Sequence, residues 1–159
     1  MSSTSKKVKL TELAELFAAE PVDVVYLFGS QARGDTGPLS DVDVALLLRP
    51  GVSRKAAFDL RLRMMAALGR LFDTDEIDVV VLNDAPLLLQ HRVLRDGKVL
   101  FCRHELRRVR YEARAISKYL DFQHLENIYN RALLARLARG GLGERARLGR
   151  HHSAAAEVG

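Results

Sequence analysis

Three aspartates stand out in this sequence because of where they fall along the chain. Asp41 and Asp43 are separated by one residue at the start of an apolar segment, and Asp78 falls inside the later apolar run 77–82. Residues two apart in a β-strand point to the same face, and their Cα atoms lie roughly 6.6–6.8 Å apart. Both carboxylates could therefore reach ions in one small site. Carboxylate oxygens are ligands that Mg²⁺ prefers, together with phosphate oxygens and water.

The position of Asp78 needs a physical explanation, because the apolar residues around it predict a strand that is buried on both faces. A buried carboxylate is unfavourable unless something compensates its charge. Metal ions would do so, and two ions about 3.5–4 Å apart could hold the attacking and leaving oxygens of a phosphoryl transfer. Taken alone, Asp78 is also consistent with a surface strand residue beside an arginine.

A glycine–serine pair supplies the other half of this candidate site. The predicted strand 24–28 runs directly into Gly29 and Ser30, and ten residues separate this pair from Asp41. Glycine lets the backbone approach a phosphate closely, and the next residues can start a helical turn whose N–H groups point at the anion. We expect Gly29 and Ser30 to bind the phosphates of a nucleotide. Arg33 could pair either with a phosphate or with Asp35.

The order of these residues resembles a known signature. The segments Gly29 to Asp35 (GSQARGD) and Ser40 to Val44 (SDVDV) are similar to the motif of the nucleotidyltransferase superfamily that includes DNA polymerase beta and the aminoglycoside nucleotidyltransferases. They most resemble the minimal nucleotidyltransferase (MNT) branch, whose members are often antitoxins paired with HEPN-domain toxins. The similarity at the level of motifs covers residues 22–101, about half of the chain.

The resemblance implies a role for each motif residue and a reaction. Gly29 and Ser30 would hold the phosphates of ATP, Asp41 and Asp43 would bind two Mg²⁺ ions, and Asp78 would complete the metal site and help to deprotonate the attacking hydroxyl. The reaction would transfer AMP from ATP to a tyrosine of a partner HEPN ribonuclease toxin and so neutralise it.

Two other functions remain open at this stage. The acceptor could be a small molecule such as an aminoglycoside, although the chain lacks the sizeable second domain that drug-modifying relatives usually need for an acceptor pocket. The chain could also be an antitoxin that neutralises its partner by binding alone, through its C-terminal helices.

The elements that must position these residues follow from the spacing of apolar residues. Strands are predicted over 23–28, 42–48, 77–82 and 99–101, and helices over 11–19, 53–72, from Pro86 onward, and over 104–139. A break near Asp121 would divide the last span into two packed helices. We therefore expect an α/β fold: a small mixed sheet flanked by helices, with a C-terminal helical extension.

Three parts are predicted along the chain. Residues 1–102 would form the nucleotidyltransferase catalytic domain, residues 103–140 the helical extension, and residues 141–159 a disordered tail. Residues 1–91 carry 10 basic against 13 acidic side chains, whereas residues 92–150 carry 15 against 6. An acidic first half suits metal binding. The basic second half suits an acidic partner or phosphate, or is simply a solvated helix face.

Composition also indicates the cellular compartment in which to expect the protein. No segment approaches the ~20 continuous apolar residues that a membrane span needs, and the polar and basic residues 1–9 are not followed by the apolar core of a secretory signal. The single cysteine, Cys102, cannot form an intramolecular disulfide. We therefore expect a cytoplasmic protein with ATP and a HEPN-type toxin as partners, without membrane or direct nucleic-acid binding. The oligomeric state does not follow from the sequence.

Overall fold

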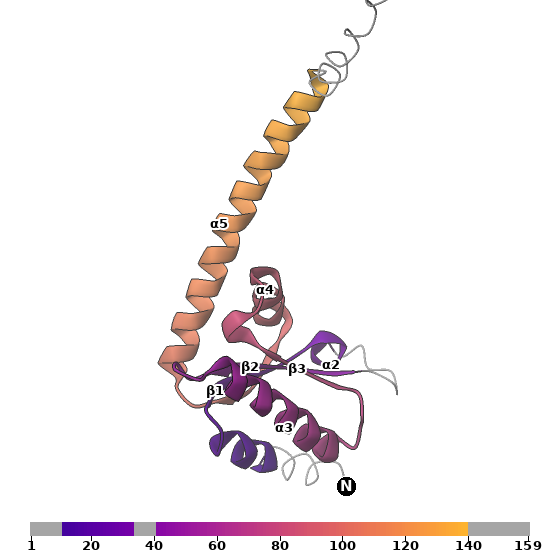
Figure 1. Ribbon diagram of the computed structural model, residues 1–159, viewed down its shortest axis with the longest axis vertical. Coiled ribbons are helices and arrows are strands. Elements are labelled where there is room, and N and C mark those ends of the chain that lie inside the picture. Colours follow the sequence, from indigo (N-terminus) through magenta and orange to yellow (C-terminus); the bar gives the residue numbers. More distant parts are fainter. Residues whose placement is uncertain (1–10, 34–40, 140–159) are drawn as a thin grey trace, which may run out of the picture. The chain divides into compact units, whose positions relative to one another are not determined.

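The computed structural model describes residues 11–33 and 41–139, and for Gln31 and Arg33 it describes the backbone alone. Its strands are β1 (Val22–Phe28), β2 (Val42–Leu48), β3 (Ile77–Val81) and β4 (Lys98–Cys102). Its helices are α2 (Gly29–Arg33), α3 (Arg54–Phe72), the short 3₁₀ helix η1 (Leu82–Asp84), α4 (Leu87–Asp96) and α5 (Glu105–Ala138), and residues 11–18 are also helical (Figure 1). These elements agree with the predicted ones to within two residues at most ends.

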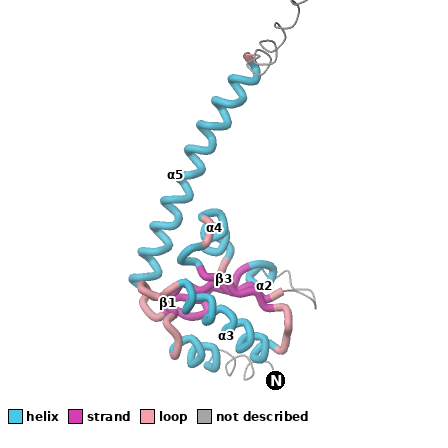
Figure 2. The backbone as a smooth tube through the Cα atoms, in the orientation of Figure 1, coloured by secondary structure: helices cyan, strands magenta, loops and turns pink. Residues whose placement is uncertain are grey.

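The strands form one mixed four-stranded sheet in the order β3-β2-β1-β4. The strands are drawn in magenta in Figure 2. β1 is antiparallel to both β2 and β4, and β2 is parallel to β3. β1 and β2 therefore occupy the centre of the sheet, where both faces are covered, and nearly all of their residues are buried. The predicted fold, a small mixed sheet flanked by helices, is confirmed.

Helices cover the two faces of the sheet and create two apolar cores. One core lies under the helical residues 11–18 and α3, and contains Phe17, Val44, Leu46, Leu60 and Met64 among others. The other lies under α4, on the opposite face, and contains Val24, Ala45, Leu47, Leu82 and Val93. Figure 1 shows α3 and α4 on opposite sides of the sheet. Alternate residues of β2 enter different cores, as the period of two in a strand requires.

The first turns of α5 are attached to the sheet and to α4 through partly buried polar contacts. The hydroxyl of Tyr26, in β1, donates to Glu112 Oε1 at 2.9 Å, and the hydroxyl of Tyr111 donates to Gln90 Oε1 at 3.0 Å. Burial raises the pKa of both tyrosines, and for Tyr26 the hydrogen bond to Glu112 raises the pKa further. Both hydroxyls are therefore held in their protonated form.

α5 is one continuous helix from Glu105 to Ala138, so the break considered near Asp121 does not occur. The chain nevertheless divides into two compact units, residues 1–119 and residues 120–159, with the boundary inside α5. No helix in residues 11–33 and 41–139 is long and apolar enough to cross a membrane. The predicted tail, residues 141–159, lies outside the described residues.

Candidate active site

Gly29 forms a tight turn between β1 and α2. Its φ angle is +74°, in the left-handed region that favours glycine. Space at this position is also restricted, because a Cβ atom on Gly29 would overlap a carboxylate oxygen of Asp43. Glycine is therefore required here for two separate reasons, and its absent side chain lets the Asp43 carboxylate lie directly against the turn.

The strand register explains why Asp43 reaches this turn. Phe28, the last residue of β1, is the antiparallel partner of Asp43 in β2. The chain turns immediately after Phe28, so Gly29 and Ser30 lie beside Asp43 at the same end of the sheet. Gly29, Ser30 and Asp43 are all partly exposed, which leaves this corner open to a ligand.

Asp78 lies opposite Asp43 across the parallel pair β2–β3. Neighbouring strands are about 4.8 Å apart, and residues that face each other across a ladder point to the same side of the sheet. The residues flanking Asp43 and Asp78 all enter the α3 core, so both carboxylates lie on the other face. A cation bound on this face could therefore be reached by both carboxylates.

The burial predicted for Asp78 is wrong. β3 is an edge strand, and the side chain of Asp78 is 53% exposed. Its charge is compensated by Arg61 of α3, whose Nη2 lies 3.3 Å from Asp78 Oδ1. The simpler alternative, a surface strand residue beside an arginine, describes this position correctly. Sequence reasoning did not find Arg61, since no local pattern connects it to a residue seventeen positions away.

Asp41 lies just outside the strand, since β2 begins at Val42, and it is exposed. The backbone N–H of Val42 donates to the carbonyl of Glu76 at 2.9 Å. This bond joins the beginnings of β2 and β3, so Asp41 precedes the strands at the same end of the sheet as Asp43 and Asp78. Arg33 ends α2, and its side chain lies outside the described part of the chain.

In the described ranges, no three His, Cys, Asp or Glu side chains gather closely enough to hold a metal ion by themselves. Mg²⁺ is usually held differently: one or two carboxylates bind it, and phosphate oxygens of the substrate and water complete its octahedral shell. The adjacent carboxylates of Asp43 and Asp78, beside an open turn, fit this mode of binding. They offer only hard oxygen ligands, and the site includes none of the nitrogen or sulfur ligands typical of zinc.

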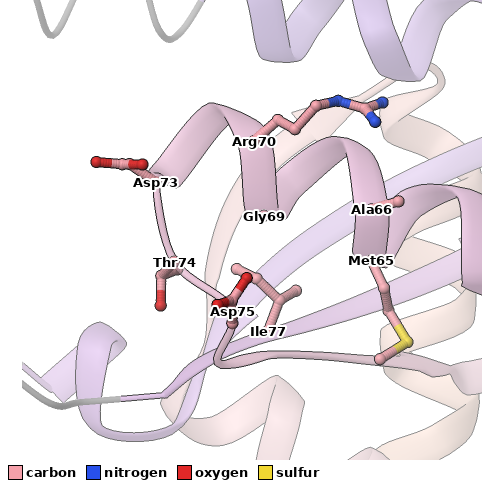
Figure 3. Close-up of a pocket in the computed structure, with 8 residues that line it drawn as sticks. All are labelled: Met65, Ala66, Gly69, Arg70, Asp73, Thr74, Asp75 and Ile77. Carbon is pink, nitrogen blue, oxygen red and sulfur yellow. The ribbon is translucent and has the colours of Figure 1, made fainter.

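A cavity of about 470 Å³ has none of Gly29, Asp43 and Asp78 in its lining. It is formed by the last turns of α3 and the loop that leads into β3, and its lining includes Gly69, Asp73, Asp75 and Ile77 (Figure 3). Ile77 immediately precedes Asp78, but Ile77 and Asp78 point to opposite faces of β3. This cavity therefore opens on the α3 face and not on the face of the two carboxylates.

Part of the chain is similar to a known protein family. The model of the family described as polymerase beta, nucleotidyltransferase matches residues 11–106. A curated relative, the protein adenylyltransferase MntA of Aphanizomenon flos-aquae, is 37% identical over 86 residues, which cover 49% of this chain and 55% of the relative. The chain thus spans about half the length of the curated relatives it matches.

Solved structures show the same fold over more of the chain. A toxin–antitoxin structure with AMP-PNP matches with a TM-score of 0.58 and 23% identity, over 84% of this chain and 99% of that one. A complex of a tri-AMPylated Shewanella oneidensis HEPN toxin with an MNT antitoxin matches with a TM-score of 0.58 and 22% identity, over 80% of this chain and 98% of that one. Because the family model covers more than half of the 159 residues, the chain belongs to the polymerase beta nucleotidyltransferase family.

Proposed function

We propose that this chain transfers AMP from ATP to a tyrosine of a HEPN-domain toxin and so neutralises the toxin. The observation that carries the proposal is the contact between the Gly29 turn and the Asp43 carboxylate, with Asp78 opposite on the next strand. The relatives support the choice of nucleotide and acceptor, since one is described as a protein adenylyltransferase and another structure contains an AMPylated HEPN toxin. The bound AMP-PNP of a similar structure supports ATP as the substrate.

In this proposal, Gly29 and Ser30 hold the phosphates of ATP, and Asp41, Asp43 and Asp78 hold two Mg²⁺ ions. When bound, the ions would neutralise charge on the phosphate oxygens. The tyrosine oxygen forms a bond to the α-phosphorus as the bond from that phosphorus to the pyrophosphate oxygen breaks. The phenolic proton passes to the Asp78 carboxylate.

We further propose that residues 1–102 form the catalytic domain and residues 103–140 a helical extension that contacts the toxin. The match of the family model to residues 11–106 supports the first boundary. The reaction would take place in the cytoplasm, where ATP and the RNA substrates of a ribonuclease are found. It would require neither a membrane nor direct nucleic-acid binding.

The test is transfer of AMP to a purified HEPN-domain partner in the presence of ATP and Mg²⁺, followed by measurement of the intact mass of the partner. We expect a gain of one or more AMP units with the wild-type chain. Asp43→Asn should abolish the gain, because it removes a carboxylate from the site. Asp59→Asn is a matched control, since Asp59 is an exposed residue of α3 that shares the change in charge but not the site.

Each other outcome has a defined meaning. Normal transfer by Asp43→Asn would contradict the proposed site. A partner that is captured and silenced without any mass gain would favour neutralisation by binding alone. Transfer to a small hydroxylated drug, with no transfer to protein, would favour an antibiotic nucleotidyltransferase.

A further inference from the structure

A second cavity, of about 270 Å³, lies at the end of the sheet away from the Gly29 turn. Its walls come from the last residues of β2, from Asn83 after β3, and from the first turns of α5. Leu48 lies five residues beyond Asp43 along β2, which corresponds to roughly 16 Å. The cavity is therefore separate from the candidate active site.

Three arginines of α5 line this cavity: Arg107, Arg110 and Arg114. Their spacing of three and four residues places them on one face of the helix. Arg107 forms an ion pair with the buried carboxylate of Asp23, with Nη1 to Oδ2 at 2.8 Å. The side chains of Arg110 and Arg114 form no ion pair or hydrogen bond with any residue that the structure describes.

The neighbouring Arg108, in contrast, has a structural role within the same helix. Its guanidinium pairs with both Glu105 and Glu112, one turn away on either side. No acidic residue of α5 is placed in this way for Arg110 or Arg114. Like charges one turn apart on a helix destabilise it by about 0.2–0.5 kcal/mol per pair. A bound anion would therefore reduce the repulsion between these arginines.

Polar contacts hold Asn83 and Asp23 in the remaining walls. The Asn83 side chain accepts a hydrogen bond from the N–H of Leu48 at 2.8 Å and donates to its carbonyl at 3.1 Å, which fixes it against the end of β2. Asp23 is 2% exposed, and its Oδ1 atom accepts no hydrogen bond, although Arg49 Nε lies 3.8 Å away. The exposed charged groups of the lining are therefore the three arginines.

We propose that this cavity binds the phosphate group of a small phosphorylated molecule. Three arginines and one aspartate give its lining a net charge of +2. That charge matches a phosphate, which carries about −1.5 to −2 at neutral pH, better than a carboxylate, which carries a single charge. Guanidinium groups bind phosphate oxygens through paired hydrogen bonds, and three of them on one wall can surround a tetrahedral group.

The test measures binding of inorganic phosphate and of AMP to the full chain by calorimetry, with a chelator present so that metal-dependent binding at the other site does not contribute. The double variant Arg110→Gln/Arg114→Gln removes the two arginines that have no structural partner. The double variant Arg131→Gln/Arg136→Gln is the matched control, since it makes the same change in charge on exposed residues of the same helix, outside the cavity. Circular dichroism spectra verify that both variants fold.

We expect the first double variant to weaken binding by about tenfold or more, because each charge-assisted hydrogen bond contributes at least about one factor of ten. The control should bind like the wild type. Tighter binding of AMP than of inorganic phosphate would identify a nucleotide as the ligand, and equal binding would identify free phosphate.

Two results would overturn the proposal. One is the absence of binding above a chloride control of equal ionic strength. The other is an equal loss of affinity in both double variants, accompanied by an equal loss for a single-stranded RNA, which would indicate a diffuse basic surface instead of a cavity for phosphate.

Discussion

Gly29 permits both a tight backbone turn and a close contact with the Asp43 carboxylate. A positive φ angle permits the turn, and the missing side chain leaves space for a carboxylate that is itself positioned by strand pairing. A second glycine, Gly51, also has a positive φ angle, of +88°, but a Cβ there would meet nothing within 4 Å. Substitutions at these two glycines therefore distinguish the effect of backbone strain from the effect of crowding the Asp43 carboxylate.

We predict that Gly29→Ala abolishes AMP transfer, because the added methyl group displaces the Asp43 carboxylate. Gly51→Ala should keep the activity and lose only about 1–2 kcal/mol of stability from the strained backbone. Transfer assays and urea unfolding measure the two effects. Equal activity of the two variants would show that the position of Asp43 at the turn is not important for the reaction.

The ion pair between Arg61 and Asp78 leads to a prediction about metal binding that rests on the proposed function. Both side chains are about half-exposed, so the pair contributes under about 1 kcal/mol to stability. We expect Arg61→Gln to leave the melting temperature nearly unchanged but to lower the Mg²⁺ concentration needed for half-maximal transfer, since it removes a cation that competes for Asp78 Oδ1.

Arg63→Gln is the control for that experiment. Arg63 lies two residues away on α3 and pairs with Glu20 at 3.0 Å, away from the carboxylates. Arg63→Gln changes the net charge by the same amount as Arg61→Gln and should leave the dependence on Mg²⁺ unchanged. If Arg61→Gln raised the required Mg²⁺ concentration, Arg61 would instead hold Asp78 in position for the metal.

Two tyrosines, Tyr26, which is buried, and Tyr111, which is partly buried, connect α5 to the sheet and to α4. A tyrosine whose pKa is raised by folding stabilises the native state fully below its unfolded pKa of about 10, and this stabilisation is lost as the pH rises above that value. The cause is that these tyrosines ionise at a lower pH in the unfolded chain than in the folded protein. We therefore predict that the free energy of unfolding falls from about pH 10 upward.

Denaturant unfolding across about pH 8 to pH 11 measures this dependence. Tyr26→Phe should reduce the alkaline loss, because it removes one of the two groups with a raised pKa. Tyr129→Phe is the control, since Tyr129 is 68% exposed and should not affect the profile. An identical alkaline loss in all three proteins would mean that other groups cause it.

The core of the molecule lies entirely in its first unit, as far as the described residues go. The buried apolar side chains run from Leu13 to Ala115, and none lies in residues 120–139. Each large side chain that is fully buried contributes roughly 1.5–3 kcal/mol, so stability is concentrated in residues 1–119. The second unit instead exposes large apolar residues along α5: Leu120, Phe122, Leu125, Ile128, Tyr129, Leu133, Leu134 and Leu137.

We predict that a chain ending at Tyr119 still folds cooperatively, because it keeps both cores, but no longer captures a HEPN partner. Circular dichroism melting and co-purification with the partner measure the two properties. A truncated chain that remains unfolded would show that the second unit stabilises the first. Capture at wild-type strength would show that the exposed apolar residues of α5 do not contribute to the complex.

Local patterns in the sequence were sufficient to predict the elements and to single out the residues proposed for the site. Apolar spacing, Ser53 as the N-cap of α3, and Pro86 before α4 are properties of neighbouring residues, and they predicted the helices and strands closely. The contact between Gly29 and Asp43 did not follow from these patterns. Thirteen residues, including α2, connect β1 to β2, and the antiparallel register that brings Asp43 beside Gly29 is a property of the folded sheet.

Only the tertiary structure showed what surrounds Asp78 and what lines the second cavity. An apolar run such as 77–82 predicts a strand but not its place in the sheet, and the place at the edge exposes Asp78 and lets Arg61 reach it. The cavity lined by Arg110 and Arg114 likewise depends on α5 packing beside the end of β2, more than sixty residues earlier in the chain. Strand order and helix packing arise from contacts between distant segments, and residue spacing within one segment carries no information about them.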